Sequence, residues 1–308
     1  MTQTLKAGDR GALVALLQLA LERAGQMPGA LDGIFGAQTA AAVRAFQAAN
    51  ALTPDGIAGA QTHRALLPYY TGFVLRTVRA GDTFSALAQQ YGTSVEAIRL
   101  ANPYLDPERL PIGRAVTVPL PFPVTPVRIP YSSALIGYVV RGLAARYPTL
   151  AIGEFGRSVL GKPLWYLTLG SGEKCVFYNA AHHANEWITT PLLLTFCEQL
   201  CARLGDGGEL GGQDIRALLR QVTLVLAPAV DPDGIDLVTG HSAASAPMPR
   251  TRSRRITLPS PSRPAGRRTS AASTSTSSTP PDGAPRARSN SPRATRAPDR
   301  ATMSVRRR

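Results

Sequence analysis

The chain has 308 residues, which is enough for about two or three domains, and its formal net charge is +14. Fifteen arginines and two aspartates lie from Arg250 onward, so +13 of this charge belongs to the last 59 residues and only +1 to the body. No apolar run reaches the ~20 residues of a membrane-spanning helix, and no signal peptide is recognisable near the start. The three cysteines, Cys175, Cys197 and Cys201, make no disulfide framework, so we expect buried thiols.

Residues 1–68 contain an internal repeat. The segment from Asp32 to Thr39, DGIFGAQT, recurs from Asp55 to Thr62 as DGIAGAQT. Each Asp-Gly pair predicts a tight turn, because glycine tolerates a positive φ angle. Amphipathic patterns around these turns predict a bundle of about three helices, the first of which we expect Asp9 to cap.

The repeat alone leaves a generic helical bundle open. Its letters, however, resemble the peptidoglycan-binding domain that is found at the ends of wall hydrolases. The resemblance rests on L-x-x-G-D-x-G followed by LQ, on DGIFG-x-x-T, on AV-x-x-FQ and on DGI-x-G-x-x-T. It spans nearly all of this segment and implies that residues 1–68 bind peptidoglycan.

After a linker expected over residues 68–76, residues 76–120 predict the order strand, helix, helix, strand. Thr83 is expected to cap the first of these helices, and the Thr93-Ser94 pair the second. The letters V-x-x-G-D-T, A-x-x-Y-G-T, AN-P and LPIG-x-x-VTVP resemble a LysM domain. That resemblance implies binding to N-acetylglucosamine in glycan chains, and the alternative is a βααβ unit that serves only as a spacer.

The proline-rich residues 121–130 predict a semi-rigid linker. Residues 131–245 then alternate between strand and helix patterns, which favours an α/β sheet with covering helices. The expected strands cover residues 151–155, 164–169, 175–178 and 222–230, and the expected helices cover residues 135–147, 187–204 and 214–221. The fold class is therefore multidomain, α+β and α/β: a small helical bundle, a βααβ domain, and an incomplete α/β domain followed by a disordered tail.

His183 and Glu186 lie between a predicted buried strand and a predicted helix, in the segment NAAHHANEWITT. This spacing lets an imidazole nitrogen and a carboxylate approach one cation, and zinc accepts that combination of ligands. The segment H-x-x-E-W-I-T resembles the first zinc motif of the zinc carboxypeptidase family (carboxypeptidase A-like). Two further motifs agree with it: GRS with GKPL at residues 156–164, and VDPDG at residues 230–234, where aspartate replaces the usual asparagine.

The resemblance implies that His183 and Glu186 are zinc ligands, whereas His182 lies one position early and is expected to support the site or the structure. The family also needs a third histidine ligand, an arginine for the oxyanion and a glutamate as general base. After Glu186 the sequence offers only His241, which is a poor third ligand, and no glutamate follows Glu209. We therefore assign no catalytic residue and expect a catalytically incomplete chain.

Residues 246–308 are rich in Ser, Thr, Pro, Ala and Arg without periodicity, which predicts a disordered basic tail. A nucleic-acid-binding arm is the weaker alternative, because the tail holds no aromatic residue to stack on a base. Synonymous codons for residues 265–276, read from the third base, spell W-K-A-D-I-R-G-V-D-L-N, which contains the G-V-D-L-N segment that the carboxypeptidase family requires. We therefore interpret the tail as out of frame, which predicts a one- or two-base insertion or deletion between the codons for Gly240 and Ser260.

These motifs in this order resemble the γ-D-glutamyl-diamino acid endopeptidases of spore-forming bacteria. They imply a zinc metallopeptidase that binds peptidoglycan and hydrolyses its stem peptides. The alternative is a non-catalytic wall-binding protein. Either function predicts peptidoglycan as the partner, without nucleic acid or a membrane span. The expected location is the cell wall, the extracellular space or the interior of a sporulating cell.

Overall fold

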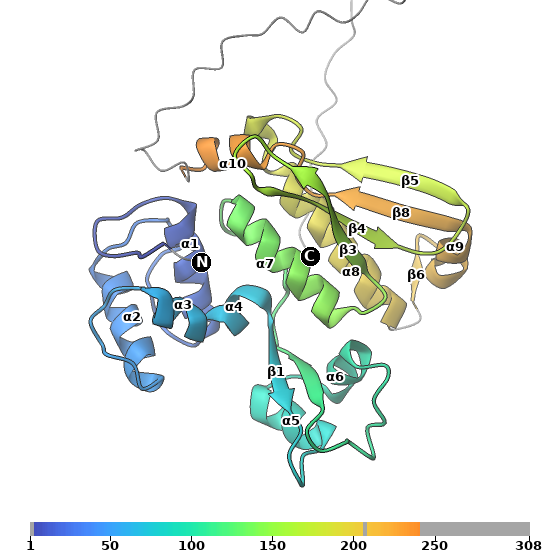
Figure 1. Cartoon of the computed structure of the whole chain (residues 1–308), viewed down its shortest axis with the longest axis horizontal. Coiled ribbons are helices and arrows are strands. Elements are labelled where there is room, and N and C mark those ends of the chain that lie inside the picture. Colours follow the sequence, from blue (N-terminus) through green and yellow to red (C-terminus); the bar gives the residue numbers. More distant parts are fainter. Residues whose placement is uncertain (1–2, 206–207, 241–308) are drawn as a thin grey trace, which may run out of the picture. The chain divides into compact units, whose positions relative to one another are not determined.

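The computed structural model describes residues 3–205 and 208–240 (Figure 1). The chain begins with a small helical domain, in which two short antiparallel bridges pair the segment ahead of the first helix with the two repeat turns. Its helices are α1 (Ala12–Arg23), α2 (Ala37–Ala49), α3 (Ala60–Ala65) and α4 (Leu67–Thr71). The predicted helical bundle is confirmed.

Asp9 does not cap α1, so that expectation is wrong. The residue before the helix is Gly11, whose φ angle of 111° lies in the region that favours glycine. The Asp9 carboxylate instead accepts a hydrogen bond from the backbone N–H of Lys6 at 2.8 Å. It closes the turn ahead of the helix, and the amide of Gly11 pairs with Gly33 of the repeat.

Each copy of the repeat encloses a buried glutamine. The amide of Gln18 donates to an aspartate, a threonine and a backbone carbonyl of the first copy, and its oxygen accepts from the Gly33 N–H at 2.9 Å. Gln47 makes the same four contacts with the second copy, including one from the Gly56 N–H at 3.0 Å. The sequence repeat is therefore a repeated hydrogen-bond cluster, which satisfies the buried polar groups at both turns.

The second domain has its own small core and follows the predicted order strand, helix, helix, strand. Its elements are β1 (Phe73–Thr77), α5 (Phe84–Tyr91), α6 (Val95–Ala101) and β2 (Ala115–Pro119), with β1 and β2 antiparallel. Thr83 and Ser94 cap the two helices as expected, accepting from the amides three residues later at 3.1 and 3.0 Å. The linker expected over residues 68–76 is wrong, because α4 and β1 occupy nearly all of it and only Gly72 separates them.

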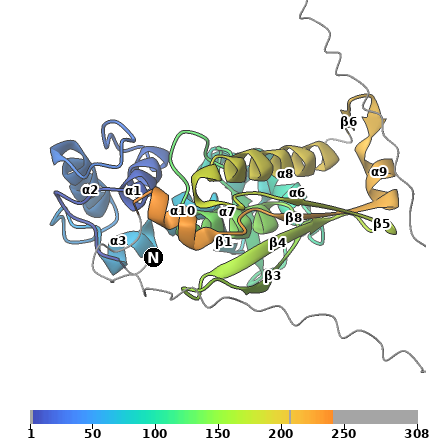
Figure 2. The same cartoon turned by 90° about the horizontal axis from the view of Figure 1, so that it is seen from above.

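The third domain is a four-stranded mixed sheet in the order β3-β4-β8-β5, of which only the β5–β8 pair is parallel. The predicted strands are confirmed as β3 (Ala151–Arg157), β4 (Pro163–Leu169), β5 (Lys174–Asn179) and β8 (Val222–Ala227). The helices and short strands are α7 (Ser133–Arg146), η1 (Ala184–Glu186), α8 (Thr189–Gly205), β6 (Glu209–Leu210), β7 (Gln213–Asp214), α9 (Ile215–Gln221) and α10 (Pro232–Val238). Helix α8 runs along one face of this sheet (Figure 2).

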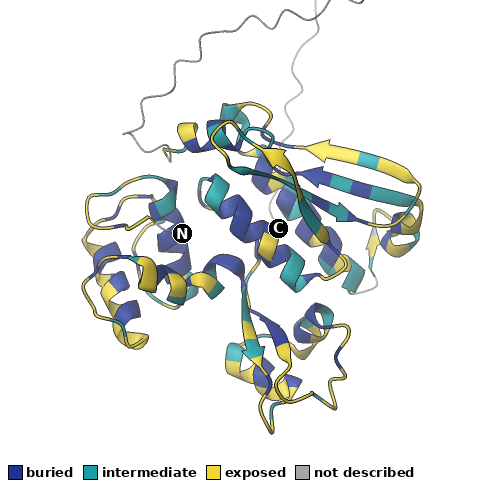
Figure 3. Ribbon diagram, in the orientation of Figure 1, coloured by how far each residue is buried: buried dark blue, intermediate teal, exposed yellow. Residues whose placement is uncertain are grey.

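Strand β5 forms the edge of the described sheet and is exposed along most of its length (Figure 3). Its aromatic side chains Phe177 and Tyr178 are more than half exposed. Cys175 is exposed as well, so the expectation of three buried thiols holds only for Cys197 and Cys201 on α8. An exposed apolar edge strand is a site for association with other chains.

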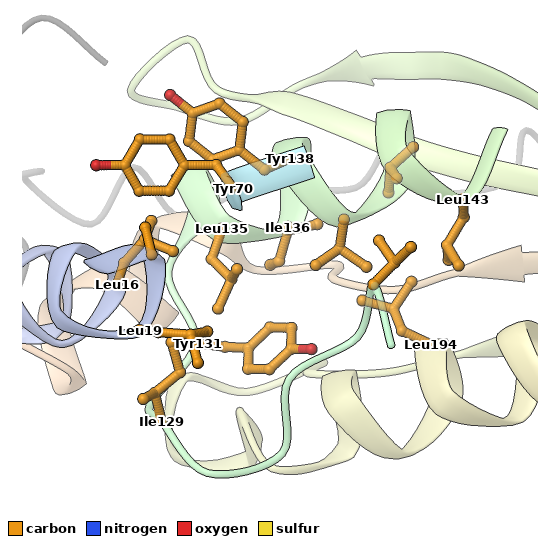
Figure 4. Close-up of a cluster of buried hydrophobic side chains, with 14 of the residues drawn as sticks. Leu16, Leu19, Tyr70, Ile129, Tyr131, Leu135, Ile136, Tyr138, Leu143 and Leu194 are labelled. Carbon is orange, nitrogen blue, oxygen red and sulfur yellow. The ribbon is translucent and has the colours of Figure 1, made fainter. Parts of the chain in front are cut away.

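One hydrophobic core joins the helical domain to the sheet domain (Figure 4). The ring of Tyr70 in α4 stacks on that of Tyr138 in α7, with the centroids 5.1 Å apart. Ile129 and Tyr131, which precede α7, are buried in the same core. The first and third domains therefore share their apolar interior.

The proline-rich run between the second and third domains is packed against the first and third domains rather than forming a free spacer. Glu198 of α8 accepts hydrogen bonds from the backbone N–H groups of Val124 at 2.8 Å and Thr125 at 2.9 Å. Arg146 of α7 donates to two backbone carbonyls of this run, those of Leu120 and Phe122, and to the carbonyl of Gly72. Arg23 of α1 donates to Pro123 O and lies over a ring of the run at 4.3 Å. We call residues 119–131 with these three charged side chains the proline clamp.

The predicted tail, residues 246–308, and His241 lie outside the described residues. Within the described ranges, no helix is both long and apolar enough to cross a membrane.

Candidate metal centre

His183 and Glu186 lie where β5 leaves the sheet, on the short 3₁₀ turn η1. The turn begins at His183, and the two residues cap each other. The backbone N–H of His183 donates to Glu186 Oε2 at 3.2 Å, and His183 Nδ1 lies 2.9 Å from Glu186 Oε1. The local spacing H-x-x-E therefore brings the two side chains together, as the sequence predicted.

The pair is open to solvent. The side chain of His183 is 70% exposed and that of Glu186 44%, so a dissolved ion can reach both. The hydrogen bonds from the side chain and backbone of His183 hold the pKa of Glu186 below its ordinary value, so this carboxylate is ionised at neutral pH. His182 packs its ring edge-on against the ring of His183, with the centroids 5.3 Å apart, and does not join the pair.

The backbone ahead of the pair is held by contacts with two other segments. Ala181 has a φ angle of +47°, uncommon for a residue other than glycine. Its N–H donates to the hydroxyl of Thr189 at 2.8 Å, and that hydroxyl donates to the carbonyl of Glu186 at 2.7 Å. The Ala181 carbonyl accepts from the Asp231 N–H at 3.0 Å. These contacts extend the β5–β8 pairing beyond the strands and fix the loop that carries the pair.

The pair fits two positions of a zinc site. Zinc bonds of about 2.0–2.2 Å at a tetrahedral angle place a nitrogen and an oxygen ligand about 3.4 Å apart. His183 Nδ1 and Glu186 Oε1 are 2.9 Å apart and face each other, so a small rotation would turn the hydrogen bond into a ligand pair. Within residues 3–205 and 208–240, no group of three His, Cys, Asp or Glu side chains meets in a cation-binding arrangement. The described residues thus bring together two side chains of the kinds that a zinc site uses, where a catalytic zinc takes three protein ligands.

The two other motifs meet beside this turn. Ser158, in the turn between β3 and β4, donates its hydroxyl to Asp233 at the start of α10 at 2.9 Å. Lys162 of the same turn pairs with Asp233 at 3.2 Å and with Asp236 at 2.7 Å. The sequence alone indicated no role for Lys162 or for either aspartate. The only signal available was that these residues lie within, or next to, motif segments with no metal ligand of their own.

Three segments of the chain match the profiles of known protein families. The profile of the peptidoglycan binding domain matches residues 10–66, that of the LysM domain matches residues 77–119, and that of the zinc carboxypeptidase matches residues 137–258. Three successive segments of the chain therefore match a peptidoglycan binding domain, a LysM domain and a zinc carboxypeptidase. His183 and Glu186 lie within the residues that match the carboxypeptidase, and the name of that family implies zinc.

Two curated relatives and one solved structure illustrate the match. γ-D-Glutamyl-L-diamino acid endopeptidase 1 of Lysinibacillus sphaericus is 36% identical over 115 residues, which are 37% of this chain and 29% of that protein. The spore cortex-lytic enzyme of Bacillus subtilis is 36% identical over 87 residues, 27% of this chain and 28% of that protein. A metallo-carboxypeptidase from Burkholderia cenocepacia is 28% identical and matches 40% of this chain and 34% of its own, with a TM-score of 0.27. This chain spans less than a third of the curated relatives it matches.

Proposed function

We propose that this protein binds peptidoglycan through residues 1–120 and acts on peptidoglycan stem peptides through its zinc carboxypeptidase segment. One observation carries the proposal. Two wall-binding domains precede, in a single packed chain, a segment whose strand-end turn brings an imidazole and a carboxylate within 2.9 Å of each other. Zinc at such a pair acts as a Lewis acid that polarises a peptide carbonyl.

The roles of the domains follow from the polymer they bind. The LysM domain holds glycan chains, and the carboxypeptidase segment faces the peptides attached to them. Two binding modules on one chain raise the local concentration of the stem-peptide amide, so weak binding by each module becomes strong binding by both. This division of roles supports a location at the cell wall, and we propose that the protein acts there, outside the cell or within a sporulating cell.

A non-catalytic wall-binding protein is the second candidate. The observation that favours it is the ligand count, because the described residues bring only two metal-binding side chains together. Each missing ligand lowers the metal affinity of a site, and a peptidase of this family needs the metal.

A sedimentation and release assay separates the two functions. We expect the full chain to sediment with insoluble peptidoglycan under both functions, because residues 1–120 are present in either case. Soluble peptide fragments, released only with zinc and not after chelation, would support the peptidase. Sedimentation without zinc retention or release would support the wall-binding protein, and failure to sediment would contradict both.

A further inference from the structure

Three charged side chains near the His183–Glu186 pair form a compact ionic cluster. Lys162 Nζ lies 3.2 Å from Asp233 Oδ1 and 2.7 Å from Asp236 Oδ2, so one ammonium group sits between two carboxylates. The side chains of Lys162 and Asp233 are only 23% and 18% exposed. Charges this far removed from water are costly unless they are paired and hydrogen-bonded.

The cluster satisfies that requirement and ties three elements together. Asp233 accepts from the Ser158 hydroxyl at 2.9 Å and from the Leu160 N–H at 3.0 Å, both in the turn between β3 and β4. Asp236 accepts from the backbone N–H of Ser133 at 2.7 Å and from its hydroxyl at 2.5 Å, at the start of α7. The cluster therefore fastens α10 to the β3–β4 turn and to α7.

Asp233 stays charged in this setting. Burial works to raise the pKa of its carboxyl, but the hydrogen bonds from Leu160, Ser158 and Lys162 outweigh burial and hold the pKa below its ordinary value. The carboxylate remains ionised at neutral pH, so the attraction to Lys162 is present under the conditions in which a zinc peptidase works.

Helix α10 packs against η1, the turn that carries the His183–Glu186 pair. Gly234, in its first turn, lies so close to η1 that an added Cβ would come 2.7 Å from the Cβ of Ala184. Ala184 lies between His183 and Glu186 in the sequence. The Asp231 N–H reaches across to the carbonyl of Ala181 at 3.0 Å. Any movement of α10 is therefore passed to the backbone on both sides of His183.

We propose that Lys162 is a positioning residue for the His183–Glu186 pair, acting through Asp233 and Asp236. It holds α10 against η1, so that the imidazole and the carboxylate stay at the spacing a zinc ion requires. The inference rests on the proposed zinc function, and it gives the GKPL and DPDG motifs a role that their lack of metal ligands left open. Outer groups that orient metal ligands affect metal affinity in this way.

The test replaces Lys162 by methionine, which keeps the long apolar stem and removes the charge, and by arginine, which keeps the charge. In metal-free protein, we expect Lys162→Met to speed hydrogen exchange at the Asp231 amide by about tenfold, because α10 loosens from η1. We expect its zinc affinity to fall by about 10–100-fold. Lys162→Arg should restore both quantities to within about threefold of the wild type.

Arg99→Met is the matched control, since Arg99 lies in α6 of the second domain and its pair with Glu96 at 2.9 Å is more than half exposed. It should change neither quantity. Should Lys162→Met fail to fold, Asp233→Asn replaces it, because the amide keeps an oxygen acceptor and loses the charge.

Two failures are distinguishable. If zinc binding in the wild type does not depend on His183 and Glu186, the proposed function is wrong, while exchange at the Asp231 amide still tests the positioning role. If Lys162→Met lowers only the unfolding midpoint and leaves amide exchange and zinc affinity at wild-type values, Lys162 is a structural ion pair and the inference is overturned.

Discussion

Replacing Glu198 by alanine is expected to lower the free energy of unfolding by about 3–5 kcal/mol, the cost of removing one partner of a buried ion pair. Glu198 is 8% exposed and its carboxylate lies 3.7 Å from Arg146. Both carboxylate oxygens also accept backbone hydrogen bonds, from Val124 and Thr125. The alanine variant would leave two buried N–H groups and one guanidinium without this partner.

The effect should spread through the proline clamp. Burial lowers the pKa of Arg23 to about 10, and the charge of Glu198 works against that lowering. Removing Glu198 therefore destabilises the protonated form of Arg23, a second residue of the proline clamp. Denaturant unfolding followed by tryptophan fluorescence measures the loss, because both tryptophans, Trp165 and Trp187, lie in the sheet domain.

Glu96→Ala is the control for this prediction. Glu96 forms a pair of similar type with Arg99 at 2.9 Å, but both side chains are more than half exposed. A solvent-exposed pair is worth at most about 1 kcal/mol, so this variant should stay close to the wild type. Glu198→Gln should lie between the two, because its amide oxygen replaces only one of the two acceptors. Equal losses for Glu198→Ala and Glu96→Ala would show that the clamp does not stabilise the fold.

Local features of this protein could be predicted from its sequence, whereas its long-range contacts could not. The caps at Thr83 and Ser94 depend on an amide only three residues away, and the His183–Glu186 pair has the same spacing. The wrong expectation that Asp9 caps α1 is also local, since its carboxylate closes the turn just ahead of the helix instead. These patterns are visible because the contact and the sequence motif span the same few residues.

The proline clamp shows the opposite case. Proline content predicted a spacer, but the packing of residues 119–131 depends on Glu198, more than 70 residues later, and on Arg23, about 100 residues earlier. The Lys162 cluster likewise joins positions about 70 residues apart. The sequence pattern of an amphipathic helix does not show whether a charged residue faces water or contacts the backbone of a segment far away in the sequence. Such contacts emerge only when the elements are packed together.

His183→Ala and Glu186→Gln are each expected to lower zinc affinity by more than about 100-fold, because loss of a group that only orients a ligand already costs about 10–100-fold. Each variant removes one of the two donors that face each other across 2.9 Å. Both side chains are exposed, so neither change should disturb the fold. Equilibrium dialysis against zinc, with cobalt(II) as a spectroscopic probe of the same site, measures the change. The amount of protein that sediments with peptidoglycan should not change, because the wall-binding domains lie earlier in the chain.

His182→Ala provides the matched control, since His182 is an exposed neighbour whose ring touches that of His183 without joining the pair. A metal held by surface histidines in general would be lost equally from all three variants. A metal held by the pair would be lost from two and retained by the third.

Binding should also weaken as the solution is acidified, because a protonated imidazole cannot ligate zinc. The low pKa of Glu186 keeps its carboxylate ionised to lower pH than an ordinary glutamate. Zinc bound with equal affinity by the wild type and by His183→Ala would place the metal elsewhere in the chain and remove the basis for a peptidase.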